Sequence, residues 1–142
     1  MLALQTRTHQ ILEPAEAFAA VTLSAIASDG YLADEEMDSL LNTLNRMSLF
    51  KSYPGDALRR MLERLFGILR REGLASLLSA GKRSLPHELQ EPAFAIATDL
   101  LLADGILSDK ERHFLNQLQQ TLGIPEETAL KILDVMTIKN CG

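Results

Sequence analysis

The sequence predicts an all-helical domain, and three observations lead to that prediction. Of its 142 residues, Leu and Ala account for 43, whereas Val and Ile, which favour strands, account for only ten. Aromatic residues are few, with two Tyr, five Phe and no Trp. The apolar positions also recur at the 3.6-residue period of a helix, most clearly between Leu58 and Leu69.

The first predicted element is an almost wholly apolar helix at about Ala15–Ala27, in which only three residues are polar. Because a helix that is apolar on all sides must be surrounded, we expect it at the centre of the fold. Asp29 and Gly30 follow, and glycine at this point permits the left-handed backbone that closes a helix. A second helix is expected to begin about three residues later, with Leu32 pointing inward.

The middle of the chain predicts two further helices in a basic insert at about 51–83. The first begins near Pro54 and runs to about Glu72, where Gly73 stops it, and the second spans about Leu74–Lys82. This insert holds eight basic and three acidic residues, whereas the rest of the chain holds six basic and sixteen acidic ones. The insert is therefore basic and both flanks are acidic.

The last third predicts a second apolar helix at about Ala93–Ala103, again with only two polar residues. Pro86 and Pro92 flank its start, so we expect an irregular first turn. Another Asp-Gly turn and helix follow. A final helix is expected at about Glu126–Met136, and Thr137–Gly142, which has no periodicity, is expected to fray.

The two acidic flanks resemble each other. Residues 29–40 align with residues 104–115 at an offset of 75, and six of the twelve positions are identical. This match predicts a duplicated helix–turn–helix unit whose two apolar helices lie in the core. The predicted organisation is a single domain over 1–142, with repeat one at about 14–48, the basic helical insert at about 51–83, repeat two at about 86–122 and the final helix at about 125–136.

The helices after the two turns differ in their predicted N-terminal caps. Ser108 and Glu111 form a capping-box pattern, in which the serine oxygen and the glutamate carboxylate each accept a backbone N–H. In the first copy Ala33 stands where Ser108 stands in the second, so Glu36 lacks a hydroxyl partner.

Four carboxylates in the two turns form a candidate metal site. Asp29 and Asp104 lie at the C-terminal ends of helices, where the helix dipole disfavours a negative charge. Glu36 and Glu111 follow in the first turn of the next helix. If the duplicated units pack together, the four oxygen-bearing side chains suit a hard divalent cation such as Ca²⁺, Mg²⁺ or Mn²⁺. The alternative is structural: each Asp caps the following helix and each Glu serves its capping box.

A family resemblance supports the metal hypothesis. Each copy has a small residue, then Asp-Gly-x-[Ile/Leu]-x-x-x-Glu and a spaced leucine, and over about Pro14 to Met136 this pattern resembles the tellurite-resistance protein B (TerB) family. The residues that form this pattern are Ala27-Ser28-Asp29-Gly30…Glu36…Leu40 and Ala103-Asp104-Gly105…Glu111…Leu115. The resemblance implies a compact bundle of about seven helices, no catalytic activity, a metal-binding acidic cluster, a role in tellurite resistance or stress responses, and a protein partner.

One position departs from the duplicated pattern. Ser24 stands where the second copy has Asp99, so a site that used Asp99 as a ligand would be asymmetric. Asp99 within an apolar helix either joins the cation site or forms hydrogen bonds with a neighbouring helix.

The sequence also bears on other functional classes. We expect no enzyme, because the three His are scattered and Cys141 is the only cysteine. The acidic flanks argue against nucleic-acid binding. The longest nearly apolar runs, 17–27 and 93–103, are too short to span a membrane. Residues 1–12 lack the apolar segment of a secretory leader, so we expect a cytoplasmic protein.

Two functions follow from these patterns. The first is a non-enzymatic, TerB-like stress-response module that binds a divalent cation. The second is a metal-free helical adaptor for another protein, in which the Asp-Gly turns are purely structural. The basic helix at about 59–71 either docks on an anionic membrane or acidic partner, or is solvated and paired with the acidic repeats.

Overall fold

The fold is all-helical, as the composition predicts. A computed structural model describes residues 12–142, and within this range the chain forms seven α-helices and no strand. It divides into two compact units, Met1–Leu85 (unit 1) and Pro86–Gly142 (unit 2). The boundary coincides with the start of the second predicted repeat. The prediction about a leader falls on residues 1–12, of which 1–11 lie outside the described range.

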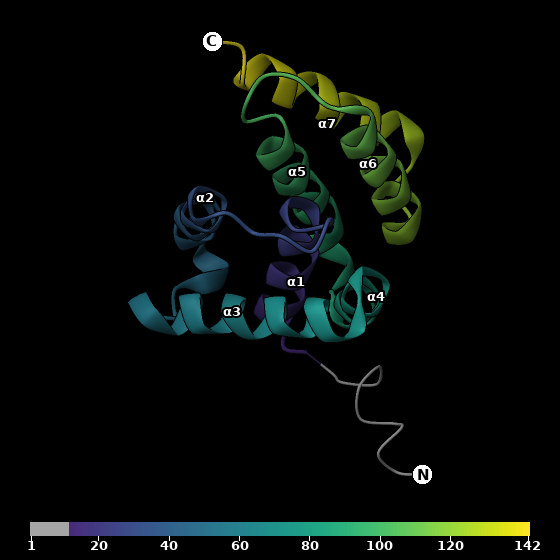
Figure 1. The fold of residues 1–142 in the computed structure, drawn as a ribbon. Coiled ribbons are helices and arrows are strands. Elements are labelled where there is room, and N and C mark those ends of the chain that lie inside the picture. Colours follow the sequence, from purple (N-terminus) through teal and green to yellow (C-terminus); the bar gives the residue numbers. More distant parts are fainter. Residues whose placement is uncertain (1–11) are drawn as a thin grey trace. The chain divides into compact units, whose positions relative to one another are not determined.

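Unit 1 contains four α-helices and one short 3-10 helix in its described part (Figure 1). They are α1 (Pro14–Ile26), α2 (Asp34–Asn45), η2 (Ser48–Phe50), α3 (Gly55–Glu72) and α4 (Leu74–Ser84). Helix α1 packs against α2, α3 and α4, and its most extensive contact is with α4. It is therefore the central helix of unit 1, as its apolar sequence predicts.

The burial of α1 extends even to its polar residues. Every residue from Ala17 to Ala25 is buried, including Thr22 and Ser24, which have no exposed surface. The Thr22 hydroxyl donates to the carbonyl oxygen of Phe18 at 3.0 Å, and the Ser24 hydroxyl donates to that of Ala20 at 2.8 Å. Because these hydroxyls are satisfied within the helix, α1 can be buried on all sides without an unpaired polar group.

Helices α1 and α4 approach each other closely at Gly81. A Cβ atom at this position would lie 3.1 Å from Val21 Cγ2, 3.3 Å from the Ala17 carbonyl oxygen and 3.4 Å from Ala20 Cβ. Small side chains on α1 and the missing side chain on α4 thus let the two backbones come together. A side chain at position 81 would require Val21 or the backbone of Ala17 to shift by a few tenths of an ångström.

Helix α3 has one apolar face and one basic face, as its periodicity predicts. Its apolar positions are mostly buried, whereas its arginines are exposed. The helix ends at Glu72, and Gly73 follows with φ = +96°, a backbone conformation that favours glycine. The helix starts one residue after Pro54, which is its N-cap residue.

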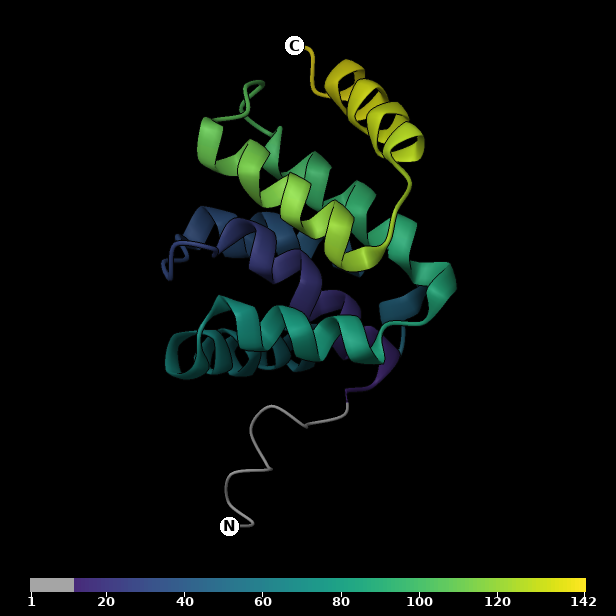
Figure 2. The same ribbon diagram turned by 90° about the vertical axis from the view of Figure 1, so that its right-hand side faces the viewer.

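Unit 2 is built around one helix, with two others packed on it (Figure 2). Its elements are η3 (His87–Leu89), α5 (Gln90–Leu101), α6 (Asp109–Leu122) and α7 (Glu126–Lys139). Helices α6 and α7 both contact α5. The 3-10 turn η3 leads directly into α5, which explains the irregular start predicted from the two prolines.

The last helix ends later than predicted. Helix α7 continues to Lys139, whereas the sequence indicated fraying from Thr137 onward, so that prediction is wrong. The Thr137 hydroxyl donates to the Leu133 carbonyl oxygen at 2.7 Å, and side chains at the end of α7 bind Asp99 of α5. These contacts hold the last turn in place.

Among residues 12–142, no helix is both long enough and apolar enough to cross a bilayer.

Candidate functional site

The first Asp-Gly turn follows α1 and has a defined internal hydrogen bond. Asp29 Oδ1 accepts the backbone N–H of Tyr31 at 3.0 Å, which is the geometry of an Asx turn. The N–H of Gly30 donates to the Ala27 carbonyl oxygen at 2.9 Å, and Gly30 has φ = +83°. Glycine is thus required for the backbone path that places Asp29 at the start of the turn.

The second turn, after α5, has the same bonds at equivalent positions. Asp104 Oδ1 accepts the N–H of Ile106 at 3.2 Å. The N–H of Gly105 donates to the Leu102 carbonyl oxygen at 2.8 Å, and Gly105 has φ = +90°. Leu107 is buried, whereas its counterpart Leu32, which the sequence predicted to point inward, is half-buried.

The glutamates of the two turns reach back to the residue that precedes the helix. Glu111 Oε1 accepts the N–H of Ser108 at 2.8 Å, and Ser108 Oγ accepts the N–H of Glu111 at 3.1 Å. The predicted capping box of α6 is therefore complete. In α2, Glu36 Oε1 accepts the N–H of Ala33 at 3.0 Å, so half of the box is present without a hydroxyl.

These hydrogen bonds give each carboxylate a structural role through one oxygen. Within residues 12–142, the second oxygens of Asp29, Glu36, Asp104 and Glu111 accept no hydrogen bond. Asp29, Glu36 and Asp104 are exposed and Glu111 is half-buried. Each turn therefore presents two carboxylate oxygens to solvent.

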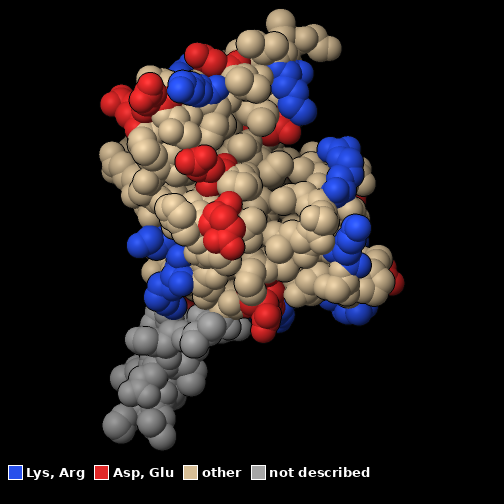
Figure 3. Space-filling model, turned by 180° about the vertical axis from the view of Figure 1, so that it is seen from behind, with Lys and Arg blue, Asp and Glu red and all other residues tan. Residues whose placement is uncertain are grey.

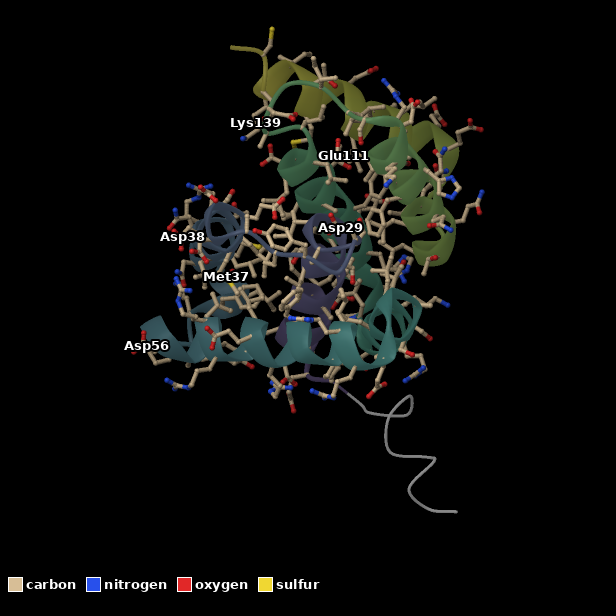
Figure 4. All side chains as sticks on the ribbon, viewed as in Figure 1. Asp29, Met37, Asp38, Asp56, Glu111 and Lys139 are labelled. Carbon is tan, nitrogen blue, oxygen red and sulfur yellow. The ribbon has the colours of Figure 1, made fainter. Side chains whose placement is uncertain are left out.

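The four predicted ligands are divided between the two units. Asp29 and Glu36 belong to unit 1, and Asp104 and Glu111 belong to unit 2; Figure 4 labels one residue of each pair. Among the described residues, no group of three or more His, Cys, Asp or Glu side chains could hold a metal ion. A site made of all four carboxylates remains a prediction.

Asp99 has partners on a neighbouring helix. Its Oδ1 accepts a hydrogen bond from Asn140 Nδ2 at 2.8 Å and pairs with Lys139 Nζ at 3.1 Å. Its side chain is only 16% exposed, so these contacts compensate a nearly buried carboxylate on α5. Of the two predicted roles for Asp99, the structure supports hydrogen bonding between helices.

The basic face of α3 is partly neutralised within unit 1. Arg59 pairs with Asp38 of α2 at 3.1 Å, and Arg64 pairs with Glu16 of α1. The Arg70 guanidinium lies 5.9 Å from the centre of the Phe66 ring. Both acidic partners belong to the first predicted repeat, so pairing with an acidic repeat is confirmed for Arg59 and Arg64.

A membrane contact through α3 would have to be electrostatic. The apolar residues of the helix face the core of unit 1 and are not available for insertion. The exposed surface of α3 also carries Asp56 and Glu63 among its arginines. Figure 3 draws the opposite side from Figure 1, and there too Lys and Arg are interspersed with Asp and Glu and separated by uncharged surface. Exposed charges of mixed sign attract an anionic surface more weakly than a field of one sign.

The tips of the two turns carry exposed apolar residues that were not predicted to be functional. Tyr31 is 68% exposed and Ile106 is 74% exposed, although both are large and apolar. Each directly follows an Asp-Gly pair. The sequence contained a signal for these exposed residues. An apolar residue follows the Asp-Gly pair in both copies, and the adjacent glycine has no side chain to cover it.

Two clefts are present among the described residues. One, of about 560 Å³, lies in unit 2 between the start of α5 and the turn before α7, and its lining includes His87, Glu91 and Ile124. The other, of about 370 Å³, lies in unit 1, and its lining includes Tyr53 and Arg60. Neither cleft includes a residue of the two Asp-Gly turns.

Comparisons of the chain with protein-family models, with curated proteins and with solved structures find no significant match.

Proposed function

We propose that the protein is a non-enzymatic, TerB-like stress-response module of the tellurite-resistance type. In this proposal the chain contains a duplicated helix–turn–helix unit, and its two Asp-Gly turns bind a divalent cation. The resemblance of the two motifs to the TerB family, and their alignment with each other at a constant offset, support it.

The observation that carries the proposal is the common geometry of the two turns. Asp29 and Asp104 each accept the N–H two positions ahead, and Glu36 and Glu111 each accept the N–H three positions back. The pattern persists although Ala33 replaces the serine of the other copy. In both turns, one Asp and one Glu are oriented by the backbone while a second oxygen of each remains open to solvent.

Such a pair has the chemistry of a hard-cation ligand set. Ca²⁺, Mg²⁺ and Mn²⁺ prefer carboxylate oxygen and water, and Ca²⁺ takes six to eight oxygen ligands. We expect Asp29 with Glu36, and Asp104 with Glu111, to supply the protein oxygens. A bound cation would offset the charge of a carboxylate that lies near the negative end of a helix dipole. Because one turn supplies only two side chains, water must complete the coordination at each turn.

The remaining parts of the proposal come from the resemblance and from the sequence. We propose a protein partner, a cytoplasmic location and no catalytic reaction. Peripheral attachment to an anionic membrane through the 59–71 helix would depend on arginines such as Arg60 and Arg71, which pair with no acidic side chain in the described part of the chain. It would therefore weaken as the salt concentration rises.

A metal-free helical adaptor is the second candidate, and one observation favours it. All four carboxylates already accept a backbone N–H, which gives each one a purely structural reason to be present. In that case the Asp-Gly turns serve as helix connections, and the exposed Tyr31 and Ile106 become contacts for the partner.

Thermal unfolding with and without cations separates the two candidates. We expect Ca²⁺, Mg²⁺ or Mn²⁺ to raise the unfolding temperature of chelator-treated protein, because a ligand at 100 times its dissociation constant adds about 2.7 kcal/mol. The double variant Asp29→Asn/Asp104→Asn should lose this shift, since asparagine keeps the Oδ1 acceptor and removes the charge.

The matched control is Asp34→Asn/Asp109→Asn, which removes the same charge from the first residue of α2 and of α6. It should retain the cation-dependent shift. An unchanged shift of the unfolding temperature in the Asp29/Asp104 variant would show that the cation binds elsewhere. No shift with any cation in the parent protein would favour the adaptor.

A further inference from the structure

The cleft in unit 1 brings together two arginines and a tyrosine. It has a volume of about 370 Å³ and is formed by the start of α1, the segment before α3 and one face of α3. Its lining combines four polar residues with two apolar ones: Tyr53, Arg60, Arg64, Glu16, Ala57 and Met61. Small-molecule pockets enclose roughly 300–1,000 Å³, so this cleft suits a small group at the lower end of that range.

Helix α3 presents both arginines to the cleft from one face. Ala57, Arg60, Met61 and Arg64 are spaced i, i+3, i+4 and i+7, so they form a single stripe along the helix. Met61 is buried, whereas the two arginines are exposed. Like charges four residues apart repel each other on a helix. The stripe therefore concentrates positive charge next to a buried methionine, and an anion placed there would relieve the repulsion.

Glu16 offsets one of these two charges and holds Arg64 in place. Its Oε2 pairs with the Arg64 guanidinium, and its Oε1 accepts the backbone N–H of Glu13 at 3.1 Å. Its side chain is only 17% exposed. Glu16 also lies in the first turn of α1, where the helix dipole favours a negative charge. Because both carboxylate oxygens are engaged, Glu16 has no free oxygen for Arg60.

Arg60 has acidic neighbours on its own helix but pairs with neither. Asp56 lies one turn before it and Glu63 lies one turn after it, at spacings that permit ion pairs. In the described part of the chain, the Arg60 side chain makes no ion pair and no hydrogen bond. It lines the cleft instead, so its N–H donors are open to a ligand.

Tyr53 adds a hydroxyl group to the same cleft. Its ring packs against Phe50 with the ring centres 6.1 Å apart, and Phe50 is buried against Phe18. These ring contacts hold Tyr53 in position from the core side. Its hydroxyl makes no hydrogen bond within residues 12–142. Three donor side chains thus line the cleft, whereas its one carboxylate already has partners for both oxygens.

The charge of the cleft favours a carboxylate over a phosphate. Two arginines and one glutamate leave a net charge of +1 among the lining residues. A carboxylate balances this charge, whereas a phosphate group is largely doubly charged near pH 7 and exceeds it. A carboxylate also accepts paired hydrogen bonds from a guanidinium and a further one from a phenol. Ala57 and Met61 offer apolar contact to a short stem behind the charged group.

We propose that this cleft binds a carboxylate group carried on a short apolar stem. Arg60, Arg64 and Tyr53 donate hydrogen bonds to the carboxylate, and Glu16 is a positioning residue that holds Arg64. A small carboxylic acid and a glutamate side chain in a peptide both supply this chemistry. The site shares no residue with the two Asp-Gly turns, so it is independent of the proposed cation binding. The affinity is expected to be weak, because both arginines are exposed and screened by solvent.

NMR titration of the full-length protein with sodium butyrate at constant ionic strength tests the site. We expect saturable shifts of the side-chain Nε–H signals of Arg60 and Arg64 and of the Tyr53 and Ala57 amides. Sodium phosphate near pH 7 should bind more weakly than butyrate. A blocked Gly-Glu-Gly peptide distinguishes the two sources of the carboxylate, with Gly-Gln-Gly as its control. Tighter binding of the Glu peptide than of butyrate would support a peptide ligand, and the reverse order a small acid.

Substitutions assign the binding to named side chains. Arg60→Gln should weaken butyrate binding about three- to tenfold and Tyr53→Phe about threefold, since each removes hydrogen bonds to the carboxylate. The matched control is Arg71→Gln, which removes an exposed arginine of α3 that does not line the cleft and should bind like the parent protein. Glu16→Gln raises the net charge of the cleft and should shift its preference from butyrate toward phosphate.

Three results would overturn the proposal. The first is a parent protein without saturable shifts. The second is phosphate binding more tightly than butyrate to the parent protein. The third is equal butyrate affinity in the parent and in Arg60→Gln, with circular dichroism showing that the variant is folded. An unchanged ratio of butyrate to phosphate affinity in Glu16→Gln would contradict the role given to Glu16.

Discussion

Gly81 is the glycine at which an added side chain would meet the most neighbouring atoms. A valine there would bring carbon atoms within contact of the Ala17 carbonyl oxygen, a backbone atom that cannot rotate away. We expect Gly81→Val to lower the free energy of unfolding by about 1–3 kcal/mol, the usual cost of overpacking a close contact. Urea denaturation followed by circular dichroism measures this directly.

Gly67 provides the matched control within a helix. A Cβ atom at position 67 would meet only the end of the flexible Arg71 side chain, at 3.2 Å. Gly67→Val should therefore be neutral or slightly stabilising, since it replaces the poorest helix former after proline. Equal destabilisation by both substitutions would show that the α1–α4 contact does not depend on Gly81.

The importance of Gly81 could not be read from the sequence. Its neighbour Lys82 gives the pattern Gly-Lys, which resembles the end of a phosphate-binding loop, but Arg83 occupies the place of the required Ser or Thr. The true role depends on which residues of α1 face α4. That information lies in the crossing of two helices that are distant in the sequence, whereas periodicity only identifies the buried face of each.

At the scale of the helix, the N-terminal caps of α6 and α2 can be tested by two opposite substitutions. Ser108→Ala removes one of the two capping bonds of α6 and should destabilise the protein by about 1 kcal/mol. Ala33→Ser completes the box in α2, where Glu36 already makes its half, and should stabilise by a similar amount. Paired denaturation curves measure both changes. Opposite signs are expected, and a loss of stability in the Ala33→Ser variant would contradict this explanation of the caps.

The end of α7 depends on a contact between helices. Replacement of Asp99 by Ala would leave Lys139 and Asn140 without their acceptor on α5. We expect faster amide hydrogen exchange at residues 137–140 and a loss of about 1–2 kcal/mol, given that Lys139 is more than half exposed. Asp99→Asn, which keeps an oxygen acceptor, should lose less. Unchanged exchange in the alanine variant would show that α7 ends at Lys139 for another reason.

The elements were predictable to the extent that they depend on local sequence. Apolar periodicity and glycine stops located the helices, including the end of α3 at Gly73. The end of α7 was predicted too early because Asp99, which stabilises it, lies on another helix far away in the chain. A local sequence pattern does not identify a partner that is distant in the chain.

At the scale of the whole molecule, some features of the candidate site follow from local sequence and others depend on parts of the chain that are far apart. The turn at each Asp-Gly pair, the positive φ of Gly30 and Gly105 and the capping box at Ser108 follow from local chemistry, and the sequence predicts all of them. The sequence of each unit specifies its own turn. Whether the four carboxylates meet depends instead on how the two units are placed. The repeated pattern predicts two similar turns but does not determine the distance between them.

The most direct test of cation binding uses Mn²⁺ as a paramagnetic probe in solution NMR of chelator-treated protein. We expect the amide signals of Gly30, Tyr31, Gly105 and Ile106 to broaden first, and added Ca²⁺ or Mg²⁺ to restore them by displacement. Asp29→Asn/Asp104→Asn should abolish the broadening at both turns, whereas Asp34→Asn/Asp109→Asn should preserve it. Broadening elsewhere, or equal broadening in the Asp29/Asp104 variant, would contradict the assignment of the two turns as a cation site.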